Sequence, residues 1–338
     1  MAWYNTASTA SDTVISTRVR LARNINGYPF ASRLDATRAR EIIEKVSLPL
    51  ENAGFLKIDF ADLSPVTATS YVEKHYVSPE FATKEAPRAL FLREASGLAV
   101  MVCEEDHLRI QSILPGLALE EAYQNAVLTE KRLDEDFDFA YSEELGYLTH
   151  CPTNLGTGMR ASVMMFLPAL THGGYMESLA NQLAKIGLTV RGLFGEGSMS
   201  AGCMYQISNQ VTLGISEEET LRKLGDAVKQ IVASEQKARK AITGDTMDRL
   251  TDRILRSEGA LKYAYMMSSG EFIRLFADVR FGIALGVVRD VTYEQLGKLL
   301  VEAMPATLTL STDNPPKTEA ARDKLRAARI QSVLTDKE

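Results

Sequence analysis

The segment at residues 147–163 constrains the chain more than any other, because it inserts a tight loop between two strand-like apolar stretches. The loop contains two glycines, Gly156 and Gly158, separated by a single residue. Glycines spaced in this way let a backbone come close to a bulky anion, and the guanidinium of Arg160 just beyond them suits phosphate oxygens. No Gly-Lys-Ser/Thr sequence follows, so the segment predicts a phosphate-handling loop that differs from a Walker A loop.

Composition narrows the class of protein. The 338 residues are 45% hydrophobic and 24% charged, which is typical of a globular protein and, at this length, favours two domains. A formal net charge of −6 argues against a general nucleic-acid binder. Three widely spaced cysteines form no zinc-binding pattern and fit a reduced cytoplasmic setting, and the sequence predicts neither a signal peptide nor a membrane span.

Hydrophobic periodicity predicts a catalytic α+β domain followed by a smaller helical one. Alternating patterns predict strands at residues 14–21, 55–60, 89–93, 98–103, 107–113, 146–150, 160–167, 188–194 and 203–214. Longer amphipathic patterns predict helices at residues 37–47, 117–134, 169–186 and 216–242. Strand patterns stop at about residue 244, so we expect a mostly antiparallel sheet in residues 12–243 and helices in residues 244–338.

Arginines recur on polar strand faces and beside turns. In the first strand, Arg18 and Arg20 lie two residues apart and project with Ser16 from one face. The opposite face of this strand consists of Ile15, Thr17, Val19 and Leu21. The other arginines of the set are Arg109, Arg160 and Arg191. Any one of them could simply lie on a solvated strand face, whereas together they would suit a triphosphate whose transfer depends on positioning and charge neutralisation.

Carboxylates mark two further positions. Glu104, Glu105 and Asp106 form the tip of a predicted hairpin, which is compatible with an ordinary acidic turn, with magnesium ligation or with the binding of a cationic substrate. Glu196 lies in a small-residue loop at residues 195–202, and by local pattern alone a flexible surface loop is the better interpretation. Cys151, at the entrance of the glycine loop, is by itself better explained as a small buried side chain than as a reactive thiolate.

Four separated motifs resemble the ATP:guanidino phosphotransferases, or phosphagen kinases, and within them the bacterial protein arginine kinases. The motifs are Ser16–Arg20, Glu104–Arg109, Cys151–Ser162 and Arg191–Glu196. They agree with this family in order and spacing over most of residues 12–240. The resemblance implies an antiparallel sheet flanked by helices, as in the phosphagen kinase catalytic domain, and the ATP-dependent phosphorylation of arginine side chains in proteins.

The resemblance also implies roles for individual residues. The five arginines would bind the phosphates of ATP, which enters with Mg²⁺, and no metal site formed by the protein itself is expected. The wider set of cofactor-binding residues comprises Ser16, Thr17, Arg18, Val19, Arg20, His75, Arg109, Arg160, Ala161, Ser162, Val163, Met164, Arg191, Gly192, Leu193, Phe194, Gly195 and Glu196. Glu105 and Glu196 would hold the substrate guanidinium as catalytic residues, and Cys151 would tune the site without forming a covalent intermediate.

Two positions depart from the family. Cys103 stands where the family usually has asparagine, and Met199 stands where an acidic residue usually follows the Gly-Glu-x-Ser/Thr sequence. The second departure bears on the affinity or specificity for the substrate, whereas Glu196 itself is retained.

Two features favour a protein substrate over a small guanidino compound. Small-substrate phosphagen kinases carry a helical domain ahead of the first arginine motif, whereas only fifteen residues precede Ser16 here, so we expect an open site. The hexad at residues 322–327 resembles a motif associated with a phosphoarginine pocket, although in an unrelated protein it would be interpreted as a solvated helix end. The residues expected to form this pocket are Arg322, Asp323, Arg326 and Ala327.

Two alternatives stay open at this point. One is a kinase for free arginine or another small guanidino compound, and the other is a non-catalytic adaptor that binds phosphoarginine. The resemblance implies a cytoplasmic homodimer in bacterial stress response and protein quality control. It also implies protein substrates with accessible arginines, and a stress-gene repressor, an AAA+ protease and a zinc-binding activator as partners, with no nucleic acid or membrane among them.

Overall fold

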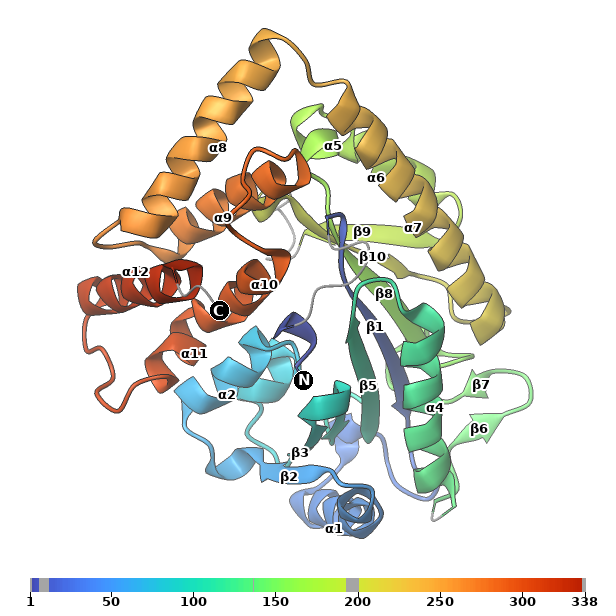
Figure 1. Cartoon of the computed structure of the whole chain (residues 1–338). Helices are drawn as coiled ribbons and strands as arrows, with labels where there is room; N and C mark the ends of the chain where they lie inside the picture. Colours follow the sequence, from blue (N-terminus) through green and yellow to red (C-terminus); the bar gives the residue numbers. More distant parts are fainter. Residues whose placement is uncertain (1, 6–11, 136, 193–200, 336–338) are drawn as a thin grey trace.

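An eight-stranded antiparallel sheet forms the centre of the computed structural model, which describes residues 2–5, 12–135, 137–192 and 201–335 (Figure 1). Its strands lie in the order β2-β3-β4-β5-β1-β8-β10-β9. They are β1 (Val14–Arg23), β2 (Leu56–Asp59), β3 (Ala89–Arg93), β4 (Leu98–Val102), β5 (Leu108–Pro115), β8 (Met159–Phe166), β9 (Leu188–Gly192) and β10 (Met204–Asn209). A separate hairpin consists of β6 (Tyr141–Ser142) and β7 (Gly146–Tyr147). The antiparallel pairing confirms the predicted fold class.

The α-helices divide into those that flank the sheet and those that follow it in sequence. The first group is α1 (Ala36–Asn52), α2 (Pro65–Glu73), α3 (Pro79–Thr83), α4 (Leu119–Asp134), α5 (Pro168–His172), α6 (Met176–Ala184) and α7 (Glu217–Lys240). The second group is α8 (Asp245–Tyr263), α9 (Ser269–Ala284), α10 (Tyr293–Glu302), α11 (Pro305–Leu310) and α12 (Glu319–Thr335). Short 3-10 turns are η1 (Trp3–Asn5), η2 (Ala31–Arg33), η3 (Phe60–Asp62), η4 (Glu94–Ser96), η5 (Pro152–Asn154) and η6 (Ala201–Cys203).

One face of the sheet is buried beneath α1, α4 and α7. Alternate strand residues such as Val19, Val100 and Ile110 point to this face and pack against Val46 of α1 and Leu224 of α7. Full burial of one such side chain stabilises the fold by about 1.5–3 kcal/mol. Because side chains alternate along a strand, the intervening residues must lie on the opposite face.

The opposite face is covered at two places. Near β3 and β4, side chains such as Leu90 and Met101 pack with Phe81 of α3 and with Trp3 of η1. At the other place, Phe166 of β8 and Met204 of β10 join the core of the C-terminal helices. Figure 1 shows these helices, α8 to α12, gathered on one side of the sheet. The helices after residue 244 therefore share a hydrophobic core with the sheet rather than standing apart from it.

No helix in the described part of the chain combines the length and the apolar character needed to cross a bilayer. Helix ends follow local signals, as at the start of α7, where the Ser216 side chain accepts a hydrogen bond from the Glu219 backbone N–H at 3.2 Å. Such a cap stabilises a helix by about 0.5–2 kcal/mol.

The first strand departs from strict alternation at its beginning. The pairing of β1 with β8 shifts register between Val14 and Ser16. As a result Val14 joins the core beneath α7, while Ile15 packs against the clusters on the opposite face. The prediction that Ile15 shares a face with Val19 is therefore wrong, because a β-bulge adds a residue that periodicity alone does not show.

Other boundaries differ for local reasons. The helix predicted at residues 169–186 is two helices, α5 and α6, because Gly173 and Gly174 interrupt it and Gly174 has a φ of 74°. Of the strands predicted at residues 146–150 and 203–214, only Gly146–Tyr147 and Met204–Asn209 are strands. The short helices α2 and α3 were not predicted, although each begins with a Ser-Pro pair that caps it.

Candidate active site

Five arginines converge on the open part of the sheet face. Each occupies the register position that points away from α1, α4 and α7, because its strand neighbours fill the core. Antiparallel pairing places Arg20 directly opposite Arg160, and Arg109 opposite Ala22 on the adjoining strand. The full set is Arg18 and Arg20 on β1, Arg109 on β5, Arg160 on β8 and Arg191 on β9. Residues far apart in sequence thus form one cationic cluster on this face.

The cluster is electrostatically unsatisfied. Burial, together with the charges of Arg160 and Arg109, lowers the pKa of Arg18 to about 10. Burial and the charges of Arg18, Arg109 and Arg160 also lower the pKa of Arg20, well below its ordinary value. Among the described residues, the buried Nε atoms of Arg20 and Arg160 have no hydrogen-bond partner. A cluster of like charges with unpaired hydrogen-bond donors is suited to bind a polyanion, which would reduce the repulsion between the charges and accept hydrogen bonds from those donors.

The carboxylate of Glu105 lies at the open side of this cluster. Glu105 lines a cavity of about 200 Å³ together with Arg20, Arg109, Cys151 and Arg160. Its Oε2 accepts a hydrogen bond from Nη2 of Arg109 at 3.0 Å, and its side chain is 37% exposed. The exposed fraction leaves room for the carboxylate to bind a second, incoming cation.

The two neighbouring acids form hydrogen bonds and ion pairs that hold the turn in place instead. Glu104 is buried, where it pairs with Arg109 at 2.8 Å and accepts a hydrogen bond from Ser78 at 2.7 Å. Asp106 is fully buried, and its Oδ1 accepts hydrogen bonds from the Asn24 amide and the His150 backbone N–H, both at 2.7 Å. Of the three acids predicted at this hairpin tip, only Glu105 is free to meet a substrate.

The glycines of the 147–163 segment have a different purpose from the predicted one. Gly156 has a φ of 98°, and a Cβ there would clash with the backbone of Thr212. Gly158 has a φ of 60°, and a Cβ there would lie 2.7 Å from the carbonyl oxygen of Ala22. Both glycines are therefore required so that this segment can pack closely against other backbone segments of the same chain. The prediction that their role is to admit an anion needs correction. Gly158 still borders the cavity that contains Arg160 and Glu105.

Cys151 lies at this cavity and is half-buried. Its Sγ is 3.0 Å from the hydroxyl oxygen of Thr153, which forms part of the same wall. The thiol is therefore beside Glu105 rather than in the hydrophobic core, contrary to the interpretation drawn from its local sequence.

His75 lies on the other side of the arginine cluster. It borders a hollow of about 20 Å³ with Ser16, Arg18, Ser162 and Gln206. Burial, with the nearby charge of Arg18, lowers the pKa of His75 to about 4, so its ring is neutral at pH 7. A neutral ring beside Arg18 avoids a further positive charge and can still donate or accept a hydrogen bond.

The low pKa of His75 predicts a stability change with pH. The unfolded chain binds this proton at about pH 6.5 and the folded chain only near pH 4, so lowering the pH through this window favours unfolding. Replacing His75 with asparagine, which tolerates the positive φ of 61° at this position, should remove this contribution. Between pH 6.5 and 4.5, wild type should lose about 1–2 kcal/mol more unfolding free energy than His75→Asn in urea titrations. Parallel losses in both proteins would contradict the shift.

Several residues predicted to bind the cofactor have side chains that point away from the arginine cluster. Val19, Ala161 and Val163 lie in the core on the helix-covered face. Thr17 shares that side, where its hydroxyl donates to the carbonyl of Gly116 at 2.6 Å. The side chains of these four residues therefore do not reach the arginine cluster, whereas Ser16, Ser162 and Met164 border the same hollow as His75. Strand alternation, which the predicted set ignored, is the reason.

Part of the predicted site lies outside the described residues. These positions are Leu193, Phe194, Gly195, Glu196 and Met199. Gly192 is the last residue of β9 before them. Cys103, the other departure from the family, is buried and has a φ of 63° at the start of the turn that holds Glu105.

Two polar residues of β10 join the site without having been predicted. The Gln206 side chain accepts a hydrogen bond from Nη2 of Arg18 at 3.2 Å. The Ser208 hydroxyl accepts one from Nη2 of Arg160 at 3.3 Å. The signal was present in the sequence, since Gln206 and Ser208 are the polar members of an alternating stretch next to buried Tyr205 and Ile207.

The hexad at residues 322–327 is not a solvated helix end. Arg326 is fully buried, and its guanidinium donates to the carbonyls of Ala303 and Met267 at 2.9 and 2.7 Å. It also pairs with Asp323 at 2.6 Å. Ala327 is buried as well, so the predicted phosphoarginine pocket needs correction: in this conformation, Arg326 and Ala327 hold α12 in place rather than face a ligand.

This burial predicts how the hexad responds to mutation. Replacing Arg326 with alanine leaves two carbonyls and Asp323 without their partner, so the free energy of unfolding should fall by about 3–5 kcal/mol. Arg322→Ala, at a half-buried position on the same helix, should cost much less. Thermal unfolding of both variants measures the difference, and equal small effects would contradict the structural role assigned to Arg326.

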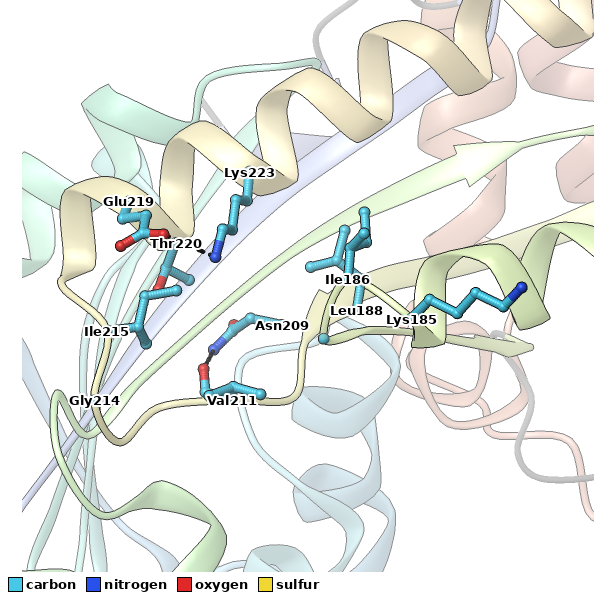
Figure 2. Close-up of a pocket in the computed structure, with 11 residues that line it drawn as sticks. Lys185, Ile186, Leu188, Asn209, Val211, Gly214, Ile215, Glu219, Thr220 and Lys223 are labelled. Atoms are coloured by element: carbon cyan, nitrogen blue, oxygen red, sulfur yellow. Dashed lines mark hydrogen bonds and ion pairs between the residues drawn. The ribbon is translucent and has the colours of Figure 1, made fainter.

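Another hollow lies at the edge of the sheet, away from the arginines. This cavity of about 340 Å³ is bordered by the turn between α6 and β9, the segment between β10 and α7, and the first turns of α7 (Figure 2). Its Lys223 pairs with Glu219 at 2.8 Å, and the Asn209 amide donates to the carbonyl of Val211 at 3.1 Å. Because these polar groups already satisfy one another, the cavity offers less for a charged ligand than the arginine cluster does.

Comparisons with known proteins agree with the geometry. Residues 40–238 match the family described as ATP:guanido phosphotransferase, C-terminal catalytic domain. Residues 247–338 match the family described as protein-arginine kinase McsB C-terminal domain. A protein-arginine kinase of Pelotomaculum thermopropionicum is 41% identical over 336 residues, which cover 97% of this chain and 94% of the relative. A protein-arginine kinase of Clostridium acetobutylicum is 42% identical over 311 residues, covering 90% and 92%.

Solved structures resemble this fold. The substrate-free duplicated taurocyamine kinase from Schistosoma mansoni superimposes with a TM-score of 0.60 at 25% identity. The match covers 74% of this chain but only 39% of that longer, duplicated chain. A crystal structure of lombricine kinase gives a TM-score of 0.60 at 24% identity and covers 72% of both chains. The antiparallel sheet with flanking helices is therefore the fold of these kinases.

Proposed function

Because this chain belongs to the ATP:guanido phosphotransferase family, we propose that it transfers the γ-phosphoryl group of ATP to arginine side chains of proteins. The observation that carries the proposal is the convergence of five arginines on one sheet face with Glu105 at their margin. Transfer between a triphosphate and a guanidinium requires a cationic and an anionic surface side by side.

The arginine cluster would bind the triphosphate of ATP. The spare donors of Arg20 and Arg160 and the lowered pKa values of Arg18 and Arg20 support this assignment, because phosphate oxygens would accept those hydrogen bonds and restore the ordinary charge balance. His75, Ser16 and Ser162 border the adjoining hollow and would contact another part of the same nucleotide.

Mg²⁺ would enter with ATP. Among the described residues, no group of three or more His, Cys, Asp and Glu side chains is placed to hold a metal ion. Mg²⁺ commonly keeps several waters and binds through substrate phosphates and one or two carboxylates, which fits a site whose available acid is Glu105. When bound, the ion would add positive charge on the phosphate oxygens, alongside the arginines.

Glu105 would orient the acceptor. A guanidinium has a pKa of about 12.5–13.8, and its full deprotonation at pH 7 would cost roughly 8 kcal/mol. A carboxylate of ordinary pKa cannot remove that proton in advance, so the proton must leave as the phosphorus–nitrogen bond forms and the bond to ADP breaks. Glu105 would align the nitrogen and accept the departing proton, and we propose that Glu196 provides a second carboxylate.

Protein-bound arginine is the proposed acceptor because the full-length relatives carry the name protein-arginine kinase. The test is incubation of the purified chain with Mg·ATP and either an unfolded protein or free arginine. Mass spectrometry at neutral pH should find acid-labile phosphate on arginine of the protein, and little phosphorylation of free arginine. The reverse preference would indicate a kinase for small guanidino compounds, and no transfer to either acceptor would favour an adaptor that only binds phosphoarginine.

We further propose a setting for this activity. Residues 12–243 would form the catalytic domain, and residues 244–338 a helical domain that recognises phosphoarginine through the half-buried Arg322 and Asp323, while Arg326 and Ala327 hold α12 in place. Family matches that meet between residues 238 and 247 support this division. A role in cytoplasmic stress response and protein quality control would involve a repressor, an AAA+ protease, a zinc-binding activator and a homodimer. Co-purification from stressed cells tests these associations.

A further inference from the structure

The turn that presents His75 is held from several directions. It follows the last residue of α2, Glu73, and His75 itself has a φ of 61°, a conformation that is uncommon for residues other than glycine. The backbone carbonyl of His75 accepts a hydrogen bond from the Gln111 side chain at 2.9 Å, on the strand that also carries Arg109. A turn of this kind keeps its shape only while its surroundings enforce it.

The first constraint comes from α11 of the C-terminal helices. Met304, the residue that precedes this helix, provides no side-chain cap, and Pro305 has no N–H. The Glu73 carboxylate supplies the missing acceptors: it accepts from the backbone N–H of Ala306 at 2.8 Å and from that of Thr307 at 2.7 Å. The Thr307 hydroxyl also donates to it at 2.7 Å. A residue two positions before His75 thus caps a helix more than two hundred positions away.

The second constraint comes from α10 through the N-terminal segment. Trp3 donates from its indole nitrogen to the carbonyl of Lys74 at 3.1 Å, and its ring meets the His75 ring edge-on with centroids 5.5 Å apart. Behind Trp3, a Cβ at Gly297 of α10 would lie 2.5 Å from the carbonyl oxygen of Tyr4. Figure 1 shows α2, α11, α10 and the N-terminal turn gathered in one region.

From these contacts we propose that Glu73 is a positioning residue, through which α11 of the C-terminal helices fixes His75 in the nucleotide site and so sets the affinity for ATP, while Trp3 supports the same turn from the side of α10. The inference rests on the proposed function, because it takes the hollow beside Arg18 as part of the nucleotide site. A loss of the Glu73–α11 contact would let the turn after α2 populate other conformations. The apparent affinity for ATP would then fall in proportion to the fraction of molecules that keep the conformation able to bind ATP.

The sequence provides a direct reporter of this turn. Trp3 is the chain's one tryptophan, and it touches His75, so its fluorescence should change when ATP binds and gives a dissociation constant without any phosphoryl transfer. The binding measurement separates this inference from the proposed function: a chain that binds ATP but phosphorylates nothing would refute only the latter.

The decisive variant is Glu73→Gln, which keeps the side-chain shape but replaces one of the two accepting oxygens with a donor. The dissociation constant and the KM for ATP should both rise by about three- to ten-fold, with kcat nearly unchanged. Glu80→Gln, an exposed acid on nearby α3, is the matched control and should leave both constants at the wild-type value. Thermal unfolding of each variant confirms that it is folded at the assay temperature.

A double variant tests whether the effect passes through His75. In the His75→Asn background, the additional change Glu73→Gln should alter ATP affinity less than about two-fold, because the group that Glu73 positions is already gone. Wild-type ATP affinity in Glu73→Gln would overturn the proposal. So would equal, additive losses in the two backgrounds, which would assign Glu73 a general structural role.

Discussion

Replacing Glu105 with glutamine should reduce phosphoryl transfer by about 10²–10⁴-fold while the chain stays folded and still binds ATP. Glutamine keeps the size of the side chain but cannot accept the proton that leaves the attacking guanidinium. It also releases Arg109 from its ion pair with Glu105, so ATP should bind at least as tightly as to wild type. Transfer to an unfolded protein, followed by mass spectrometry at neutral pH, and titration of Trp3 fluorescence with ATP measure the two effects.

The control for this experiment is Glu143→Gln, which changes an exposed acid on the β6–β7 hairpin and should have no effect on transfer. Near-normal turnover in Glu105→Gln would remove this residue from the mechanism. Loss of ATP binding together with turnover would instead show that the carboxylate supports the nucleotide site through Arg109.

The second large effect is expected at Arg20, where replacement by methionine should stabilise the free protein and abolish tight ATP binding. Arg20 is surrounded by the charges of Arg18, Arg109 and Arg160, and no hydrogen-bond partner for its Nε lies among the described residues. Removing a buried, like-charged group should raise the free energy of unfolding by about 1–3 kcal/mol in the absence of nucleotide. The loss of its charge-assisted hydrogen bonds should weaken ATP binding by about 100-fold or more.

Arg23→Met is the matched control, since Arg23 is a buried arginine on the same strand whose charge is satisfied. It pairs with Glu130 at 2.5 Å and lies over the Tyr147 ring at 3.4 Å. The same substitution there should destabilise the protein by about 3–5 kcal/mol, so the two variants differ in the sign of the effect. Urea unfolding without nucleotide gives both values. A destabilised Arg20→Met variant would contradict the claim that repulsion among the clustered arginines destabilises the protein when no ligand is bound.

The arginine face could be predicted from sequence because strand alternation is a local property. Polar Arg18 and Arg20 alternate with apolar Val19 and Leu21, and such a pattern on a sheet with one buried face leaves the polar positions on the other face. The same alternation would have removed Thr17 and Val163 from the predicted cofactor site. It would also have added Gln206.

The acidic turn shows where sequence reasoning reached its limit. Glu104, Glu105 and Asp106 are consecutive, and nothing in their order states which one faces the arginines. The choice depends on contacts with distant segments: Ser78 holds Glu104, and Asn24 holds Asp106. Only after those partners are placed is Glu105 left at the cavity. Arg326 was misjudged for the same reason, because its partners Met267 and Ala303 lie in the segments that follow α8 and α10.

The sequence by itself determined the antiparallel α+β class, the positions of most strands and the residues available for phosphate chemistry, because periodicity and motif spacing depend on neighbours along the chain. Only the tertiary structure decided that Arg20 lies opposite Arg160, that the glycines of the 147–163 segment pack against other chain segments, and that Glu73 joins the C-terminal helices to His75. These features depend on register and on long-range packing, where the free energy of a contact belongs to two segments that the linear sequence keeps apart.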